Sequence, residues 1–242
     1  MADQTRLEEL PEDWDKALAV AAHPDDLEYG AASAVARWTS QGKHVIYLIV
    51  TRGEAGIDSM PPDETGPLRD AEEKKSASIV GVETVEFLNH TDGTIEYGLP
   101  LRRDITRAIR RYRPDILVTL NYRLTWDGAL LNMADHRWVG LAVLDAARDA
   151  GNRWIFPELG EEGLEPWNRV KMVCFSGSPR PTHAVDVTAF LHRGIASLKE
   201  HRKYLESLSG SFDPEAFLRE SAAGTGKLLG CKFAVSFEVI KI

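Results

Sequence analysis

Cysteine is nearly absent from the 242-residue sequence. Cys174 and Cys231 lie in different segments, without Cys-x-x-Cys spacing. Neither a disulfide framework nor a thiolate zinc cluster is therefore expected. Long apolar runs are also missing, and the polar, acidic start of the chain has no signal-peptide pattern. We expect a cytoplasmic protein that makes no contact with a membrane.

An excess of positive charge is lacking as well. The 37 acidic residues outnumber the 29 basic residues, which gives a formal net charge of −8. A surface of this sign repels nucleic acid and anionic membranes. The densest basic segment, residues 101–114, carries apolar residues at three- and four-residue spacing, so its arginines are expected on the solvated face of a helix. We predict no nucleic-acid partner.

The sequence does contain short apolar runs that alternate with helical patterns. Several runs are apolar on both faces, which is typical of central strands in a parallel sheet. The predicted strands are residues 16–22, 44–50, 82–88, 115–120, 170–176 and 233–240. The predicted helices are residues 26–41, 67–80, 100–113, 135–150 and 188–208. This order predicts a single α/β domain, residues 1–242, with a Rossmann-like, mostly parallel sheet and helices on both faces.

Two polar clusters come directly after predicted strands. AAHPDDLE (21–28) follows the first strand, and NYRLTWDGALLNMADHRWVG (121–140) follows the fourth. In a Rossmann-type order the first and fourth strands are neighbours at the point where the winding reverses, and ligands bind there, beyond the carboxyl ends of the strands. Both clusters are therefore expected to open into one crevice.

The residues of these clusters suit a catalytic metal ion. His23 and Asp26 from the first cluster, with His136 from the second, would provide two imidazoles and one carboxylate. This set fits zinc with an open position for water, and Fe²⁺ or another divalent ion can use the same ligands. The neighbouring Asp25 is the candidate base that accepts a proton from that water.

Each cluster also has a purely structural interpretation. Asp25 or Asp26 can cap the helix that follows, because a carboxylate at a helix start satisfies free backbone N–H groups. His136 can be a surface residue in the first turn of its helix. The occurrence of two such clusters at matching strand ends favours the metal site.

Other segments carry weaker signals. Glu54, in TRGEAG (51–56), can line the pocket, and Tyr122 and Trp126 can either stack on a sugar ring or pack in the protein. SAAGTGKLLG (221–230) fails both the phosphate-loop and the dinucleotide patterns. We expect a loop there, before the last strand.

AAHPDDLEYG (21–30) resembles the signature of the PIG-L/LmbE-like zinc-dependent deacetylases, which remove acyl groups from N-acylated amino sugars and related amides. The similarity continues through TRGEAG, LRDAEEKKSASIVGV, Asp92-Gly93, ADHR, VDVT and SLKEH, over about residues 16–201. The family's Rossmann-like fold agrees with the order of elements predicted above.

The resemblance also implies roles for individual residues. His23, Asp26 and His136 would be the zinc ligands, with Asp25 as the general base. Arg69 would bind substrate or order the site. Asp92 is a further candidate for substrate binding.

One position departs from the family's second motif, His-x-Asp-His. The sequence here is MADH, with Met133 in place of the first histidine, which assists at the developing oxyanion. Loss of one such donor typically lowers the rate about 10²- to 10³-fold. Either His201 or Arg69 takes over this role, or the activity is low or altered. Asp135 remains and can orient a metal-bound histidine.

The sequence thus predicts a zinc-dependent hydrolase that removes an acyl group, in the first instance acetyl, from an N-acylated amino sugar or glycoside. One alternative is an amidase acting on a thiol-conjugated sugar or an antibiotic-type amide. Another is a metal-containing binding module with weak turnover. The sugar, the acyl group, the physiological metal and the oligomeric state, a homo-oligomer included, are left open.

Overall fold

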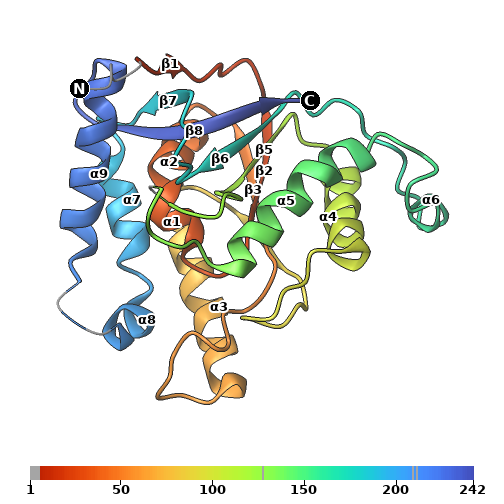
Figure 1. Ribbon diagram of the computed structural model, residues 1–242, viewed down its shortest axis with the longest axis horizontal. Helices are drawn as coiled ribbons and strands as arrows, with labels where there is room; N and C mark the ends of the chain where they lie inside the picture. The colour runs from red at the N-terminus through yellow and green to blue at the C-terminus, as the bar shows by residue number, and fades with distance from the viewer. Residues whose placement is uncertain (1–5, 127, 209, 211) are drawn as a thin grey trace.

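The computed structural model describes residues 6–126, 128–208, 210 and 212–242, and its strands form one eight-stranded sheet in the order β1-β7-β8-β6-β5-β2-β3-β4 within those residues (Figure 1). The strands are β1 (Glu8–Glu9), β2 (Lys16–Ala21), β3 (His44–Ile49), β4 (Thr84–Phe87), β5 (Ile116–Leu120), β6 (Met172–Ser176), β7 (His183–Asp186) and β8 (Ala234–Lys241).

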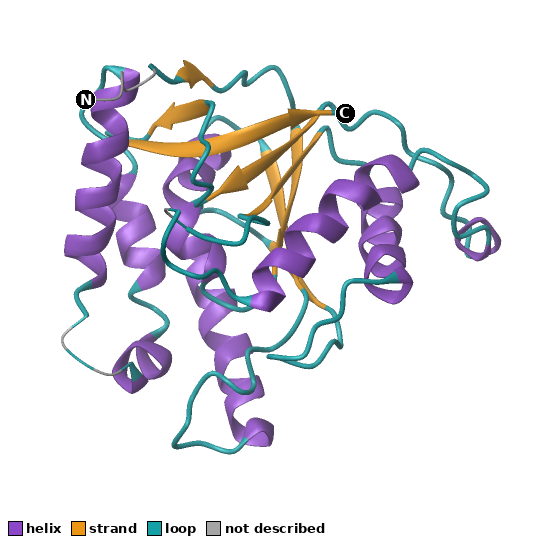
Figure 2. Cartoon of the chain, viewed as in Figure 1, coloured by secondary structure: helices purple, strands orange, loops and turns teal. Residues whose placement is uncertain are grey.

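Helices cover both faces of this sheet (Figure 2). They are α1 (Asp26–Gly30), α2 (Ala32–Ser40), α3 (Pro62–Ile79), α4 (Leu99–Tyr112), α5 (Ala134–Asp149), α6 (Glu158–Glu161), α7 (Leu191–Leu198), α8 (Arg202–Ser207) and α9 (Pro214–Leu229). Among the described residues, none of these helices is long and apolar enough to cross a membrane. The prediction of a mostly parallel sheet between helical layers is confirmed.

The buried residues of β2 show why the sheet needs a helical layer on each side. Ala17, Ala19 and Ala21 belong to a core shared with α2 and α3, whereas Leu18 and Val20 belong to a second core shared with α4 and α5. Successive side chains of a strand point to opposite faces, so both faces of β2 are dry. This explains the nearly continuous apolar run in the sequence.

The strand order confirms the expected Rossmann-type arrangement. β2 pairs in parallel with β3 on one side and with β5 on the other. The strands predicted as first and fourth are therefore neighbours. The described segments that follow them, 22–25, 121–126 and 128–133, leave the same edge of the sheet and precede α1 and α5.

Two predicted helices are each divided in two. The segment 26–41 is α1 and α2, which meet at Ala31, and 188–208 contains α7 and α8, with His201 directly before α8. Gly30 is the last residue of α1, and a Cβ there would lie 2.7 Å from the Ser176 Oγ. A larger residue at position 30 would therefore have to displace the Ser176 side chain at the end of β6. The helix predicted at 67–80 begins earlier, at Pro62.

The expectation of a loop at 221–230 is wrong, because most of this segment lies in α9. The carboxylate of Asp213 caps the helix by accepting bonds from the Glu215 and Ala216 N–H groups, and Gly230 ends it with a φ of 91°. Position 226, inside the helix, is occupied by glycine because a Cβ there would lie 2.7 Å from the Lys232 carbonyl oxygen. The glycine allows close helix packing and does not mark a turn.

The sheet also contains strands that the sequence did not predict. β1 and β7 are short and pair with each other in parallel at one edge. β8, the strand predicted at 233–240, lies between β7 and β6 and is antiparallel to both, so the sheet is mixed at this end. Strands this short carry too few residues for a periodic pattern to show.

Candidate metal centre

The turn after β2 directs two adjacent carboxylates toward different partners. Asp25 has a φ of 91°, in the left-handed region that non-glycine residues seldom occupy. Its Oδ1 lies 3.1 Å from the Arg69 Nη2, whereas the Oδ1 of Asp26 lies 3.1 Å from the His136 Nε2. The backbone conformation at Asp25 therefore separates the two carboxylates in space although they are neighbours in sequence.

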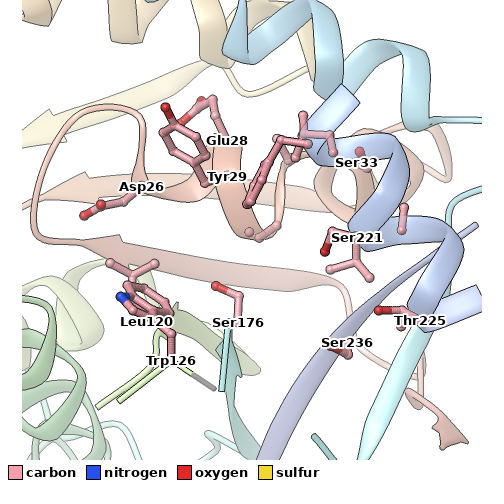
Figure 3. Close-up of a pocket in the computed structure, with 18 of the residues that line it drawn as sticks. Asp26, Glu28, Tyr29, Ser33, Leu120, Trp126, Ser176, Ser221, Thr225 and Ser236 are labelled. Atoms are coloured by element: carbon pink, nitrogen blue, oxygen red, sulfur yellow. The ribbon is translucent and has the colours of Figure 1, made fainter. Parts of the chain in front are cut away.

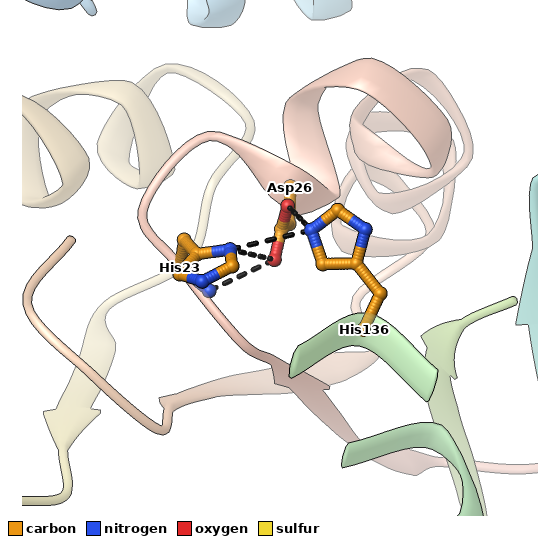
Figure 4. Close-up of side chains that lie close together, drawn as sticks. All are labelled: His23, Asp26 and His136. Carbon is orange, nitrogen blue, oxygen red and sulfur yellow. Dashed lines mark hydrogen bonds and ion pairs between the residues drawn. The ribbon is translucent and has the colours of Figure 1, made fainter. Parts of the chain in front are cut away.

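The structure brings the three predicted ligands to one point (Figure 4). The His23 Nδ1 lies 3.2 Å from the His136 Nε2 and 3.5 Å from the Asp26 Oδ2. All three side chains are buried, and they can hold a metal ion by their mutual distances. Asp26 also accepts a hydrogen bond from the His23 backbone N–H, at 2.8 Å, which fixes the carboxylate at the start of α1.

The outward-facing nitrogen of each imidazole has its own partner. The His23 Nε2 lies 3.0 Å from the Asp92 Oδ1 and 3.2 Å from the Asp135 Oδ2, and the His136 Nδ1 lies 3.1 Å from the Asn132 Oδ1. Such outer bonds fix a histidine so that its inner lone pair points at the ion. The donor set fits a divalent cation on this ground. Sequence reasoning missed Asn132, whose only signal was its position four residues before His136.

The carboxylates around His23 favour a positive charge at this point of the structure. Burial alone would lower the pKa of this imidazole, but the Asp26 charge and the hydrogen bonds to Asp135, Asp26 and Asp92 raise it well above the usual value. A cation held at this point would therefore compete with a proton on His23. Metal binding in such a site is coupled to proton release.

Asp135 links the metal centre to the segment that follows β4. Its carboxylate accepts hydrogen bonds from the Gly93 N–H at 2.8 Å and from the Ile95 N–H at 3.2 Å, besides its contact with His23. The residue thus lies where the sequence placed an orienting carboxylate. It orders a loop and an imidazole together.

Glu54 and Asp92, both expected to bind substrate, form hydrogen bonds that join two loops. The Asp92 N–H donates to the Glu54 Oε1 at 2.9 Å, and the Asp92 Oδ2 accepts from the Ala55 N–H at 2.8 Å. The other Asp92 oxygen faces His23. These contacts join the loops after β3 and β4 behind the metal ligands, and neither residue lines the cavity described below.

Arg69 orders the turn that carries Asp25. Its guanidinium donates to the Pro24 carbonyl at 2.6 Å and to the Gly53 carbonyl at 3.0 Å, and it stacks 4.2 Å above the Tyr204 ring. It also neutralises Asp25. These contacts hold the turn after β2 in place.

Asp25 has the environment of a proton acceptor. Burial raises the pKa of its carboxyl, the Arg69 charge lowers it, and Asp26 raises it, with a net value of about 6. Its Oδ2 is buried and has no hydrogen-bond partner among the described residues. One carboxylate oxygen is therefore held by Arg69 while the other is available.

His201 lies in a second buried cluster, with Glu28 and Glu73. Its Nε2 is 3.6 Å from the Glu73 Oε2 and 3.8 Å from the Glu28 Oε2, and its side chain has no solvent exposure. Burial opposes the charged imidazole, but the two carboxylates raise its pKa to about 9. Glu73 also accepts a bond from the Asp25 N–H at 3.1 Å. Glu28 and Glu73 were not predicted as site residues, and their signal in the sequence was their place inside the motifs containing Asp26 and Arg69.

A cavity of about 400 Å³ opens beside the metal centre, with Asp26 and His136 in its wall. Trp126 also lines it, with its ring centroid 5.6 Å from that of His136. Tyr122 does not line it but packs edge-on against Phe175, and its hydroxyl lies 3.5 Å from Glu238. Met133 is half exposed, directly before α5.

The chain is similar to several proteins named as deacetylases and to a mycothiol S-conjugate amidase of Streptomyces coelicolor, with which it is 25% identical over 221 residues, covering 81% of this chain and 69% of that protein. The chain is 28% identical over 229 residues to diacetylchitobiose deacetylase of Thermococcus kodakarensis, which covers 92% of this chain and 82% of that protein. It is 28% identical over 136 residues to a probable N-acetyl-alpha-D-glucosaminyl L-malate deacetylase 2 of Bacillus anthracis, covering 53% of this chain and 58% of that protein.

A solved structure has the same fold. N,N'-diacetylchitobiose deacetylase from Pyrococcus horikoshii superposes with a TM-score of 0.86 at 24% identity, covering 95% of this chain and 85% of that one. The model of the family described as PIG-L, GlcNAc-PI de-N-acetylase, matches residues 18–147, which include all three candidate ligands and Asp25. The protein is a member of the PIG-L family.

Proposed function

We propose that the protein is a zinc-dependent hydrolase that removes the acyl group from an N-acylated amino sugar, with acetyl as the simplest case. The observation that carries this proposal is the convergence of His23, Asp26 and His136 beside a carboxylate that stays free, Asp25. The relatives from Thermococcus kodakarensis and Bacillus anthracis are named as deacetylases of N-acetylated sugars, and these names support the substrate class.

His23, Asp26 and His136 would hold the ion. When bound, zinc supplies the Lewis acidity that polarises an amide carbonyl and makes water nucleophilic near neutral pH. Asp92, Asp135 and Asn132 keep the two imidazoles turned toward it. A displacement of a reacting group by about 1 Å can lower the rate about 10²-fold, so these outer contacts belong to the catalytic arrangement.

Asp25 moves the proton. Its unpartnered Oδ2 accepts a proton from the attacking water and returns it to the departing amine, so the products are a free amino sugar and a carboxylate. Arg69 holds the other oxygen and limits the pKa of the carboxyl, so Asp25 is ionised at neutral pH.

His201 acts through other residues and not on the substrate. Its fully buried side chain faces Glu28 and Glu73, and Glu73 in turn receives the N–H of Asp25. We assign it the role of positioning the turn that carries Asp25. Trp126, in the cavity wall next to His136, is the aromatic residue placed to contact substrate.

The test combines metal analysis with a hydrolysis assay. Purified protein loaded with zinc should contain one ion per chain and release acetate from N-acetylglucosamine or N,N'-diacetylchitobiose. Asp25→Asn should lower kcat by at least about 10³-fold, within the range that general acid–base catalysis contributes, and keep the zinc. Zinc retained without turnover on any amide would contradict the proposal and favour a binding module.

A further inference from the structure

The cavity beside the metal centre continues well beyond the ligands. Figure 3 shows Asp26 near one end, with Ser221 on α9 and Ser236 on β8 toward the other, and Tyr29 between them. The walls come from α1, α9, and the ends of β6 and β8. Its volume of about 400 Å³ falls in the range of small-molecule pockets and leaves ample space beyond an acetyl group.

The interior of this cavity is mostly apolar. Its walls include Leu120, Leu191, Leu218, Ala222 and Val235, and the charged residues in its wall, Asp26, Glu28 and His136, come from the metal-centre side. The Ser176 hydroxyl already donates to the Thr119 carbonyl, at 3.3 Å. The hydroxyl-bearing residues Tyr29, Ser33, Ser221, Thr225 and Ser236 also line the cavity, and a sugar ring placed here would depend on these few groups to replace the water lost from its own hydroxyls. An alkyl chain would gain free energy with each methylene removed from water.

The position of Asp25 indicates which part of an amide enters the cavity. Asp26 and His136 line the cavity and Asp25 does not. Since Asp25 returns the proton to the departing nitrogen, the nitrogen and its sugar lie on the Asp25 side of the carbonyl carbon. The substituent of the acyl carbon then points away from Asp25, toward the cavity.

We propose that this cavity binds the alkyl chain of an acyl group longer than acetyl, so that the preferred substrate is an amino sugar carrying a medium-length N-acyl chain. The inference rests on the proposed hydrolase function and adds the class of acyl group. An apolar aglycone on the sugar is the rival occupant.

A series of substrates tests the length of the chain. N-Acetyl-, N-butanoyl-, N-hexanoyl- and N-octanoyl-glucosamine are compared by release of the free amine from the zinc-loaded protein. Burial of one methylene corresponds to about a fourfold gain in kcat/KM, so kcat/KM should rise about fourfold per methylene until the cavity is filled. A flat or falling series with acetyl release intact would overturn this inference and leave the proposed function standing. No release from any member would reject both.

A fifth substrate distinguishes an acyl chain in the cavity from an apolar aglycone. The octyl glycoside of N-acetylglucosamine carries the same chain on the other side of the amide. It should be hydrolysed no better than N-acetylglucosamine itself. A gain with the glycoside but not with N-octanoyl-glucosamine would assign the cavity to an aglycone and contradict the acyl assignment.

Substitutions on α9 test the place of the chain. Ser221 lines the cavity but is exposed, so Ser221→Trp narrows it without burying new bulk in the core; Ala222→Trp, from a buried wall position, fills it more fully. The ratio of kcat/KM for octanoyl to acetyl should fall at least tenfold in both. Ala216→Trp, on the same helix and outside the cavity, should keep the wild-type ratio. An unchanged ratio in folded Ser221→Trp would place the chain elsewhere.

Binding of the acid product gives a readout independent of turnover. Calorimetric titration should show octanoate binding at least tenfold more tightly than butanoate to the wild type and to Ala216→Trp. Ser221→Trp should lose this difference. Equal affinity of the wild type for both acids would overturn the inference.

Discussion

Two buried clusters in this protein are built from the same kinds of side chain. His23, Asp26 and His136 form the candidate metal centre, and Glu28, Glu73 and His201 form a second group whose mutual distances would also suit an ion. They differ in their outer contacts. Each imidazole of the first cluster has a polar partner on its far side, whereas neither nitrogen of His201 has a hydrogen-bond partner among the described residues.

The difference shows that proximity alone does not make a metal site. In the first cluster the outer partners fix the direction of each inner lone pair, and a cavity gives access. In the second, Glu28 also lines the cavity, whereas Glu73 and His201 are fully buried, and the two carboxylates hold the pKa of His201 up to about 9. We infer that an ion binds at the first cluster, and that a proton on His201 balances the charge of the second.

The largest expected effect is a difference in zinc content between variants of His136 and of His201, one histidine from each cluster. His136→Ala should remove the bound zinc and lower kcat by more than about 10³-fold, because the ion is lost with its ligand. His201→Ala should keep one zinc ion per chain. Inductively coupled plasma mass spectrometry on both variants after dialysis measures this. Loss of the ion from His201→Ala alone would reverse the assignment.

The second prediction concerns stability against pH. The folded-state pKa of His201, about 9, exceeds the unfolded value of 6.5, so its contribution is fully present below about pH 6.5 and is lost as the pH rises to about 9. Up to about 3 kcal/mol of the free energy of unfolding follows from this difference. Urea unfolding of the metal-free protein at several pH values should show the loss. His201→Gln should flatten the curve over this window.

A smaller effect is expected on zinc affinity when a carboxylate behind a histidine is replaced in one cluster or the other. Asp135→Asn should weaken zinc binding about 10- to 100-fold, since a residue behind a metal-bound histidine typically has that influence. Glu73→Gln is the matched control, because this carboxylate faces His201 and not His23. Competition with a chromogenic chelator gives both affinities. An equal loss in the two variants would mean that general destabilisation is responsible.

The smallest predicted change is a shift in pH dependence. Asp25 must be ionised to accept a proton, so kcat/KM should rise tenfold per pH unit up to a limit at about pH 6, or lower with the cation bound beside it. The Arg69 charge lowers the pKa of Asp25, so Arg69→Gln should move this limit upward. A pH–rate profile in which the acid limb stays fixed in Arg69→Gln would contradict the assignment of Asp25 as the base.

The central strands and the meeting of the candidate metal ligands were predictable because each has a local signal. The buried runs of β2, β3 and β5 show their two dry faces in the sequence, and His23 and Asp26 stand in one short motif. The strand order then brings His136 to the same place. Local pattern and global topology agree here.

The remaining features depend on contacts between distant segments. Gly226 is inside α9 because the Lys232 backbone comes close, which no local pattern shows. Asp92 was expected near the substrate, and it faces His23 because the loop after β4 is bonded to the loop after β3 and reaches the turn after β2. Tyr122 packs against Phe175 of the neighbouring strand. In each case the partner in space decided the role.

The left-handed backbone at Asp25 bears on how the candidate base should be replaced. Asparagine is among the few side chains that tolerate a φ of 91°, whereas alanine or a β-branched residue would add conformational strain of about 1–3 kcal/mol at the same position. Glycine would relieve that strain but would make the backbone at this position more flexible. An amide at this one position thus isolates the chemistry of the acid from the shape of the chain that presents it.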